Sequence, residues 1–190
     1  MFVLEKKHET FLGLMKKHEH FLFLGLINLA LVIELLGQFF AGSLFMGAVL
    51  LALFHRKLMI FNLPKNRTLV TYGIWIALWS IITGTLLSGI DLFAIFGRHI
   101  FFISGIALLT IMIASRVTLS HGGHGLHLES SSKSLGAVVA LAMLSSMLRF
   151  LPSVMDFLTY EHALFCAAIL WVLSNIIWFI SFGKKIYQPG

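Results

Sequence analysis

Three histidines at regular spacing are the first candidates for metal chemistry in this chain. The stretch SRVTLSHGGHGLHLE (Ser115–Glu129) carries them as His121, His124 and His127. Imidazole is a good ligand for copper, zinc or iron. The interspersed glycines favour a loop that folds around an ion over a regular helix, and Glu129 could add an oxygen ligand. The pattern fits a metal site, but it also fits a polar loop that is merely rich in histidine.

A second set of candidate ligands lies at the ends of apolar runs. His99 and His162 each begin such a run, with Arg98 and Arg149 nearby. Facing histidines on two helices can hold a haem iron between them. Guanidinium groups match carboxylates such as the haem propionates. These four residues form a candidate haem site; the alternative is that the histidines only bridge the apolar and polar layers at a membrane boundary.

Glu34 is an acidic residue inside an apolar run. A carboxylate in hydrocarbon is costly unless it is paired, protonated or faces water, so such a residue suggests a function. Glu34 is a candidate to ligate a metal or to relay protons to a buried cofactor. Its alternative role is a structural ion pair with Arg98 or Arg149.

The elements that must position these side chains are membrane helices. The chain is 58% hydrophobic and 12% charged, whereas soluble domains average about 45–50% and about 25%. Long runs that are continuously apolar cross lipid as helices, because only helices and closed barrels satisfy the backbone there. The six runs are Phe21–Phe40, Ser43–Ile60, Thr68–Ile90, His99–Leu119, Leu135–Leu151 and His162–Phe182.

The basic residues predict the orientation of this bundle. Of 14 lysines and arginines, all except Arg98 and Arg149 fall before the first run, after the last, or in the loops and run ends on that same side. The positive-inside rule places that side, with both termini, in the cytoplasm. We predict an all-α integral membrane protein with about six transmembrane helices. Residues 1–20 form a basic amphipathic segment at the headgroups, 21–183 the transmembrane domain and 184–190 a basic tail.

The sequence also argues against several classes of protein. The chain has one cysteine, Cys166, so no disulfide framework is expected. The net charge of +6 follows from the loops, so no nucleic-acid partner is expected. No nucleophile–base pair, phosphate-binding glycine loop or carboxylate pair stands in a catalytic arrangement, which leaves enzymatic activity an open question. The N-terminus lacks the pattern of a cleaved signal peptide.

The histidine stretch resembles the signature of the NnrS family, which runs approximately R-x-S-L-G-H-T-G-R. Its matching positions here are Arg116, Thr118, Leu119, His121 and Gly123. The family has glycine and arginine where this chain has Ser120 and His124, and His127 has no counterpart.

Three further stretches are similar to the same family. HIFFISGIALLTIMIASR (His99–Arg116) resembles the helix before the signature, with Gly105 near its glycine. AMLSSMLRF (Ala142–Phe150) resembles an A-x-x-R helix with Arg149 as its arginine, and the last helix and basic tail also agree. The resemblance covers Arg98–Pro189 well and the preceding helices more loosely.

The resemblance implies a multi-pass protein of the bacterial inner membrane that binds haem, of the b type, and also copper. It implies a role in nitric oxide handling and denitrification, with nitric oxide as a small ligand. His99 would be the leading haem ligand, with His162 as its partner. His121 would lead the second site, and Arg116 would orient the loop or pair with a propionate.

The resemblance also bears on partners. Family members have about twelve spans, so the chain looks like a C-terminal half. It is then expected to form a homodimer in the lipid bilayer or to serve as an accessory subunit of a larger membrane oxidoreductase. An alternative is a purely structural subunit of a respiratory complex, such as a haem–copper oxidase or nitric oxide reductase. A third is a metal transporter, which is weakened by the lack of a polar ladder across the membrane.

Overall fold

The computed structural model describes the backbone of residues 2–121, 128–150, 152 and 159–187, and their side chains except at 2–18, 128, 131 and 187. Within these residues the chain is all-helical. The elements are α1 (Phe2–Leu35), α2 (Phe39–Leu58), α3 (Leu69–Ser88), the 3-10 turn η1 (Asp91–Phe93), α4 (Ala94–His99), the π-helix η2 (Ile100–Ala107), α5 (Leu108–His121), α6 (Leu128–Ser131), α7 (Lys133–Leu148) and α8 (Tyr160–Tyr187).

Four helical segments are long and apolar enough to cross a membrane. They are Phe39–Leu58, Leu69–Ser88, Asp91–His121 and Tyr160–Ile186. The fifth predicted run is the shorter apolar helix α7, and the first is the second part of α1. Large apolar side chains remain exposed on α1, α2, the rod from Asp91 to His121, α7 and α8, which is expected where lipid replaces water as the solvent.

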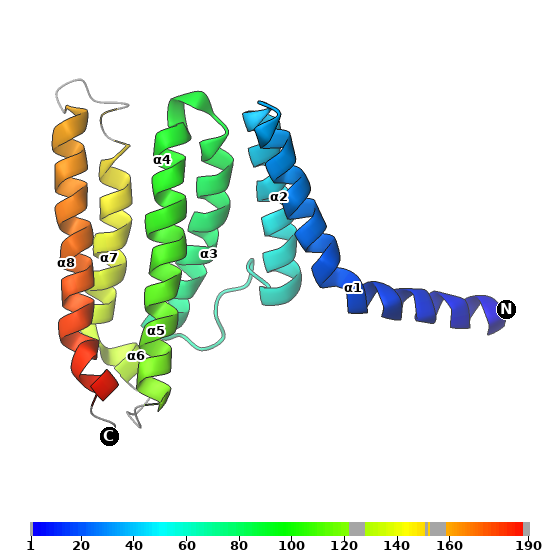
Figure 1. Ribbon diagram of the computed structural model, residues 1–190. Helices are drawn as coiled ribbons and strands as arrows, with labels where there is room; N and C mark the ends of the chain where they lie inside the picture. Colours follow the sequence, from blue (N-terminus) through cyan, green and yellow to red (C-terminus); the bar gives the residue numbers. More distant parts are fainter. Residues whose placement is uncertain (1, 122–127, 151, 153–158, 188–190) are drawn as a thin grey trace.

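The helices follow one another across the molecule in chain order (Figure 1). Each long helix packs on the next: α1 on α2, α2 on α3, α3 on the α4–η2–α5 rod, that rod on α7, and α7 on α8. The end at which α2 closes with Arg56 and Lys57, and α8 with Lys184 and Lys185, is here called the basic end. The opposite end is the far end. The N-terminal part of α1 points away from the bundle (Figure 1).

The first predicted run, Phe21–Phe40, ends too late. Helix α1 stops at Leu35, and Gly37 adopts a left-handed backbone with φ 84°. Its N–H donates to the Glu34 carbonyl and that of Gln38 to the Ile33 carbonyl, at 2.9 and 3.2 Å. This pair of bonds is a Schellman cap, which glycine favours because it has no Cβ. The two phenylalanines that follow therefore begin α2, which reaches 20 residues.

The fourth predicted run, His99–Leu119, begins too late. The helical rod starts at Asp91 and runs without a break to His121. His99 therefore lies about two turns, or about 12 Å, along the rod from its far end, and not at its tip. The polar residues Asp91 and Arg98 suggest a loop in the sequence, yet both lie in the rod and are exposed.

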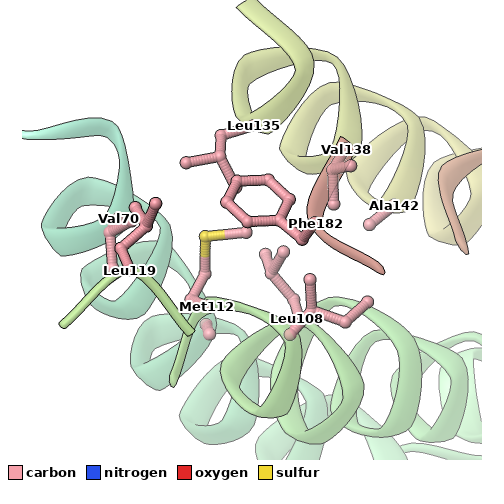
Figure 2. Close-up of a cluster of buried hydrophobic side chains, with 10 residues drawn as sticks. Val70, Leu108, Met112, Leu119, Leu135, Val138, Ala142 and Phe182 are labelled. Atoms are coloured by element: carbon pink, nitrogen blue, oxygen red, sulfur yellow. The ribbon is translucent and has the colours of Figure 1, made fainter. Parts of the chain in front are cut away.

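The main core lies where α3, α5, α7 and α8 converge. Its fully buried side chains include Leu108 and Met112 from α5, Leu135 from α7 and Phe182 from α8. Figure 2 shows the Phe182 ring between Leu135 and Val138 on one side and Met112 and Leu108 on the other. Among the residues whose side chains the structure describes, none from α1 or α2 belongs to this cluster. The main core is therefore shared by α3, α5, α7 and α8, and α2 packs on α3 through a second, smaller cluster.

Buried serines join the helices of this core. Ser145 donates to the Ala167 carbonyl at 2.8 Å, and Ser174 donates to the Val138 carbonyl at 3.1 Å. Both bonds connect α7 with α8. A third bond, between the hydroxyls of Ser104 and Ser146 at 2.7 Å, connects η2 with α7. Small residues let helices approach closely, and their hydroxyls hold the helices together where no water competes.

Two glycines allow α3 and α4 to cross closely. A Cβ added at Gly97 would lie 2.4 Å from the Ser88 backbone nitrogen, and one at Gly84 would lie 2.5 Å from that of Phe101. The obstacles are backbone atoms, so no side-chain rotation can relieve them. This crossing fixes the position of α4, and with it His99, against α3.

Candidate functional site

His99 is held in one tautomer by its own helix. Its Nδ1 lies 2.7 Å from the Ile95 carbonyl oxygen one turn earlier. A carbonyl oxygen only accepts, so Nδ1 must carry the proton. The neutral ring then presents an unprotonated Nε2, which is the form in which histidine binds a metal. His99 is half-buried.

Arg149 is the second polar group at the far end. It follows the last residue of α7, is half-buried, and lies within electrostatic range of His99 on α4 and Tyr160 on α8. Its Nε is buried and, among the described residues, has no hydrogen-bond partner. Buried donors are normally paired, so an unpaired guanidinium nitrogen is an available anion contact. We call His99, Arg149 and Tyr160 the far-end cluster.

Aromatic side chains lie beside this cluster. The Phe150 ring, next to Arg149, has its centroid 4.8 Å from that of Phe96 and 5.8 Å from that of Phe93. These contacts place the end of α7 against η1 and α4, level with the turn before His99. The cluster therefore combines an imidazole, a cation and an apolar aromatic wall.

A π-helix follows His99 directly. η2 spans eight residues, Ile100–Ala107. Gly105 there packs on Ile81 of α3, because an added Cβ would lie 2.8 Å from its Cγ1. Most π-turns are short and many occur at functional sites. Nothing in the apolar sequence IFFISGIA distinguishes this geometry from an α-helix, so sequence reasoning missed it.

The other two residues of the predicted haem site, His162 and Arg98, are more exposed than His99 and Arg149. His162 is exposed in the first turn of α8, with its Nδ1 bonded to Thr159 Oγ1. Arg98 is exposed. Within the described residues no hydrogen bond or ion pair joins His99 to His162. The described structure instead places Arg149 within electrostatic range of both His99 and Tyr160, and sequence reasoning did not select Tyr160.

Glu34 has a local partner. Ser43 of α2 donates to its Oε1 at 2.9 Å, and Ser43 lies 3.5 Å from Ser88 of α3. In the described part of the chain Glu34 forms no ion pair with Arg98 or Arg149, so that predicted pairing is not observed. Glu34 instead begins a short polar chain from α1 to α3, and roles in metal binding or proton transfer stay predictions.

At the basic end, Glu129 anchors the segment that follows the histidine loop. Its side chain is 4% exposed, lies 3.7 Å from the Arg116 Nε, and accepts from Thr68 Oγ1 at 3.3 Å. Thr68 is the N-cap of α3 and forms a capping box with Thr71. A carboxylate there is favoured by the positive end of the helix dipole. Through Glu129, Arg116 thus connects α6 to α5 and Thr68 connects it to the start of α3; the predicted role of Arg116 in orienting the histidine loop stays a prediction.

The histidine metal site stays a prediction. His121 is the exposed last residue of α5, and His124 and His127 lie outside the described residues. Among the residues that the structure describes, no group of three or more histidine, cysteine, aspartate or glutamate side chains could hold a metal ion.

A charged cluster that sequence reasoning missed joins α1 to α2. Glu19 is 5% exposed and meets Arg56 Nε at 3.0 Å and Lys57 Nζ at 2.6 Å. In the sequence Glu19 belongs to the basic repeat KKHEHFL, which suggests a solvated surface. The signal that could have found it is the Arg56–Lys57 pair at the end of the next apolar run.

This cluster predicts a pH-dependent stability. The hydrogen bond from Lys57, with the charges of Arg56 and Lys57, lowers the pKa of Glu19 below its usual value. A lowered folded-state pKa stabilises the fold above the unfolded pKa of about 4.3, and the effect is lost as pH falls through the folded pKa. We expect Glu19→Gln to lower Tm by a few degrees at neutral pH and by progressively less below about pH 4.

Thermal unfolding of both proteins in detergent across this pH range tests the expectation. Exposed Glu161, replaced by glutamine, is the matched control and should show little change at any pH. A Tm difference for Glu19→Gln that stays constant down to acid pH would contradict the ion-pair explanation.

The comparisons with known proteins agree with the motif resemblance. A family model described as NnrS protein matches residues 5–189, which extends well beyond the Arg98–Pro189 stretch. Comparison with curated proteins and with solved structures gave no match. Because the family match covers nearly all of the described helices, we conclude that this chain belongs to the NnrS family.

Proposed function

We propose that the protein binds a haem at the far-end cluster and acts in the response of the cell to nitric oxide. The observation that carries the proposal is the His99 tautomer: Nδ1 donates to the Ile95 carbonyl, which leaves Nε2 free to bind iron. Membership of the NnrS family supports the link to nitric oxide.

The other residues of the cluster fit this ligand. The unpaired, buried Nε of Arg149 suits a carboxylate such as a propionate. Phe93, Phe96 and Phe150 offer an apolar surface to a macrocycle. A haem bound there supplies an iron that takes up nitric oxide or passes on an electron, depending on whether a coordination position stays open. His99 fits the role of ligand better than His162, whose Nδ1 is bonded to Thr159 at the helix start.

The orientation belongs to the same proposal. The basic end collects the cations of the α2–α3 connection, α5 and the end of α8, so it faces the cytoplasm of a bacterium by the positive-inside rule. The far-end cluster then lies toward the outer leaflet of the inner membrane.

The absorption spectrum of the full-length protein, purified in detergent, tests the proposal. We expect a Soret band that shifts when nitric oxide or carbon monoxide is added, and iron in the preparation by elemental analysis. A colourless, iron-free preparation from cells supplied with haem would contradict the proposal and favour a structural subunit of a respiratory complex. Copper in the same elemental analysis would support the predicted second site.

A further inference from the structure

A cavity of about 530 Å³ opens at the basic end, away from the far-end cluster. The connection from α2 to α3, whose path toward α5 is seen in Figure 1, forms part of its lining. Its walls come from the last turn of α2, from that connection, from the first turns of α3 and from Arg116 of α5. The proposed haem site uses none of these residues, and among them Arg116 also contacts Glu129 of α6.

The cavity has a strongly positive rim. Four cations line it: Arg56, Lys57, Lys65 and Arg116. Glu19 neutralises part of this charge through Arg56 and Lys57, and Glu129 lies 3.7 Å from Arg116. Two carboxylates against four cations leave an excess of positive charge. Lys65 is exposed and has no ion-pair or hydrogen-bond partner among the described residues.

The floor of the cavity is apolar and buried. Ile60 is 1% exposed, and its carbonyl accepts a hydrogen bond from Trp75 Nε1 at 2.8 Å. Leu78 continues the floor. At the mouth, Leu58, Met59 and Leu63 are each more than half exposed. A soluble anion would leave these apolar side chains uncovered, whereas an amphiphile would cover them.

The cavity also lies at the depth of lipid headgroups. Helix α2 ends at Leu58 and α3 begins at Leu69, and both are long and apolar enough to cross a membrane. The connection between them therefore lies at the boundary of the hydrocarbon. Basic clusters at this depth attract anionic lipids.

We propose that this cavity binds the phosphate headgroup of an anionic phospholipid. Lys65 and Arg116 contact the phosphate, and Leu58, Met59 and Leu63 contact the start of the acyl chains. A soluble phosphate would offer the same anion to Lys65 and Arg116. Only a lipid would also cover the apolar side chains at the mouth, so the mouth favours the lipid.

Native mass spectrometry of the full chain tests this proposal. The protein is equilibrated with phosphatidylglycerol and phosphatidylcholine of identical acyl chains in equal amounts. We expect the wild type to retain phosphatidylglycerol preferentially. Lys65→Glu should reduce that preference by at least about fivefold, since each cation near the surface contributes about a factor of five. Lys133→Glu changes the net charge equally but lies outside the cavity, so it should keep the preference.

Each other outcome overturns the proposal. Equal retention of both lipids by the wild type would show that the cavity does not select the anion. An equal loss in Lys65→Glu and Lys133→Glu would indicate attraction by net charge alone. Inorganic phosphate that displaces the phosphatidylglycerol completely would identify a soluble phosphate as the ligand. Unchanged helicity by circular dichroism shows that the variants are folded.

Discussion

Replacing His99 with alanine is expected to remove the Soret band from the purified protein, whereas His162→Ala is expected to keep it. The reason is the difference between the two imidazoles. His99 is half-buried with a fixed Nδ1–H, so it presents Nε2. His162 is exposed and bonded to the Thr159 hydroxyl. Loss of the proposed iron ligand should lower the haem affinity by at least about a hundredfold, because even the outer-shell partners of metal ligands contribute about 10–100-fold.

The same spectra test Arg149. Arg149→Gln should weaken haem retention by about tenfold, because a hydrogen bond to a charged group contributes about 1.5–3 kcal/mol. Haem content is measured as the ratio of Soret to protein absorbance after gel filtration, with the elution volume as the control for folding. If His99→Ala retains the full band while His162→Ala loses it, the ligand assignment is wrong. If both variants lose it, the iron has two histidine ligands.

Gly97→Ala is expected to destabilise the fold by about 2–3 kcal/mol, the upper part of the range for overpacking. The added Cβ would meet the Ser88 nitrogen at 2.4 Å and the Leu87 carbonyl carbon at 2.7 Å. These are backbone atoms of α3, so α3 and α4 must separate. That separation also moves His99, and haem retention should fall with stability.

Gly136→Ala is the matched control for this substitution. Gly136 lies within α7, and an added Cβ would meet only Leu69 Cδ1, at an ordinary 3.9 Å. Alanine in a helix interior is favoured over glycine by about 0.5–1 kcal/mol, so this variant should be slightly more stable. Thermal unfolding in detergent compares the three proteins. A Gly97→Ala protein as stable as the wild type would show that the helices cross less closely than described.

The apolar runs were sufficient to predict the helices but not their ends. Composition and run length found every long helix, because lipid leaves few alternatives for an apolar backbone. The ends depend on single residues: Gly37 closes α1 through its left-handed backbone, and Met59 closes α2 in the same region at φ 50°. A methionine carries no sequence signal for that conformation.

The candidate site could be predicted only for residues whose own type suggests a chemical role. His99 and Arg149 stand out as polar groups beside apolar runs, and in the structure they lie within electrostatic range of each other. Tyr160 could not be selected, because its position depends on how α7 and α8 pack. Glu19 was missed for the same reason, since its partners Arg56 and Lys57 are distant in the sequence. Contacts between helices depend on tertiary packing, which the spacing of residues along one helix does not predict.

The π-helix at Ile100–Ala107 has a consequence for the whole rod from Asp91 to His121. Each residue of an α-helix turns the chain by about 100°, and a π-turn takes up an additional residue without that rotation. The segment therefore sets the angular phase between the half of the rod that carries His99 and the half that carries Arg116. Without the additional residue, the two halves of the rod would be rotated relative to each other by about 100° about the helix axis. A single helix thereby presents different faces to its neighbours at its two ends.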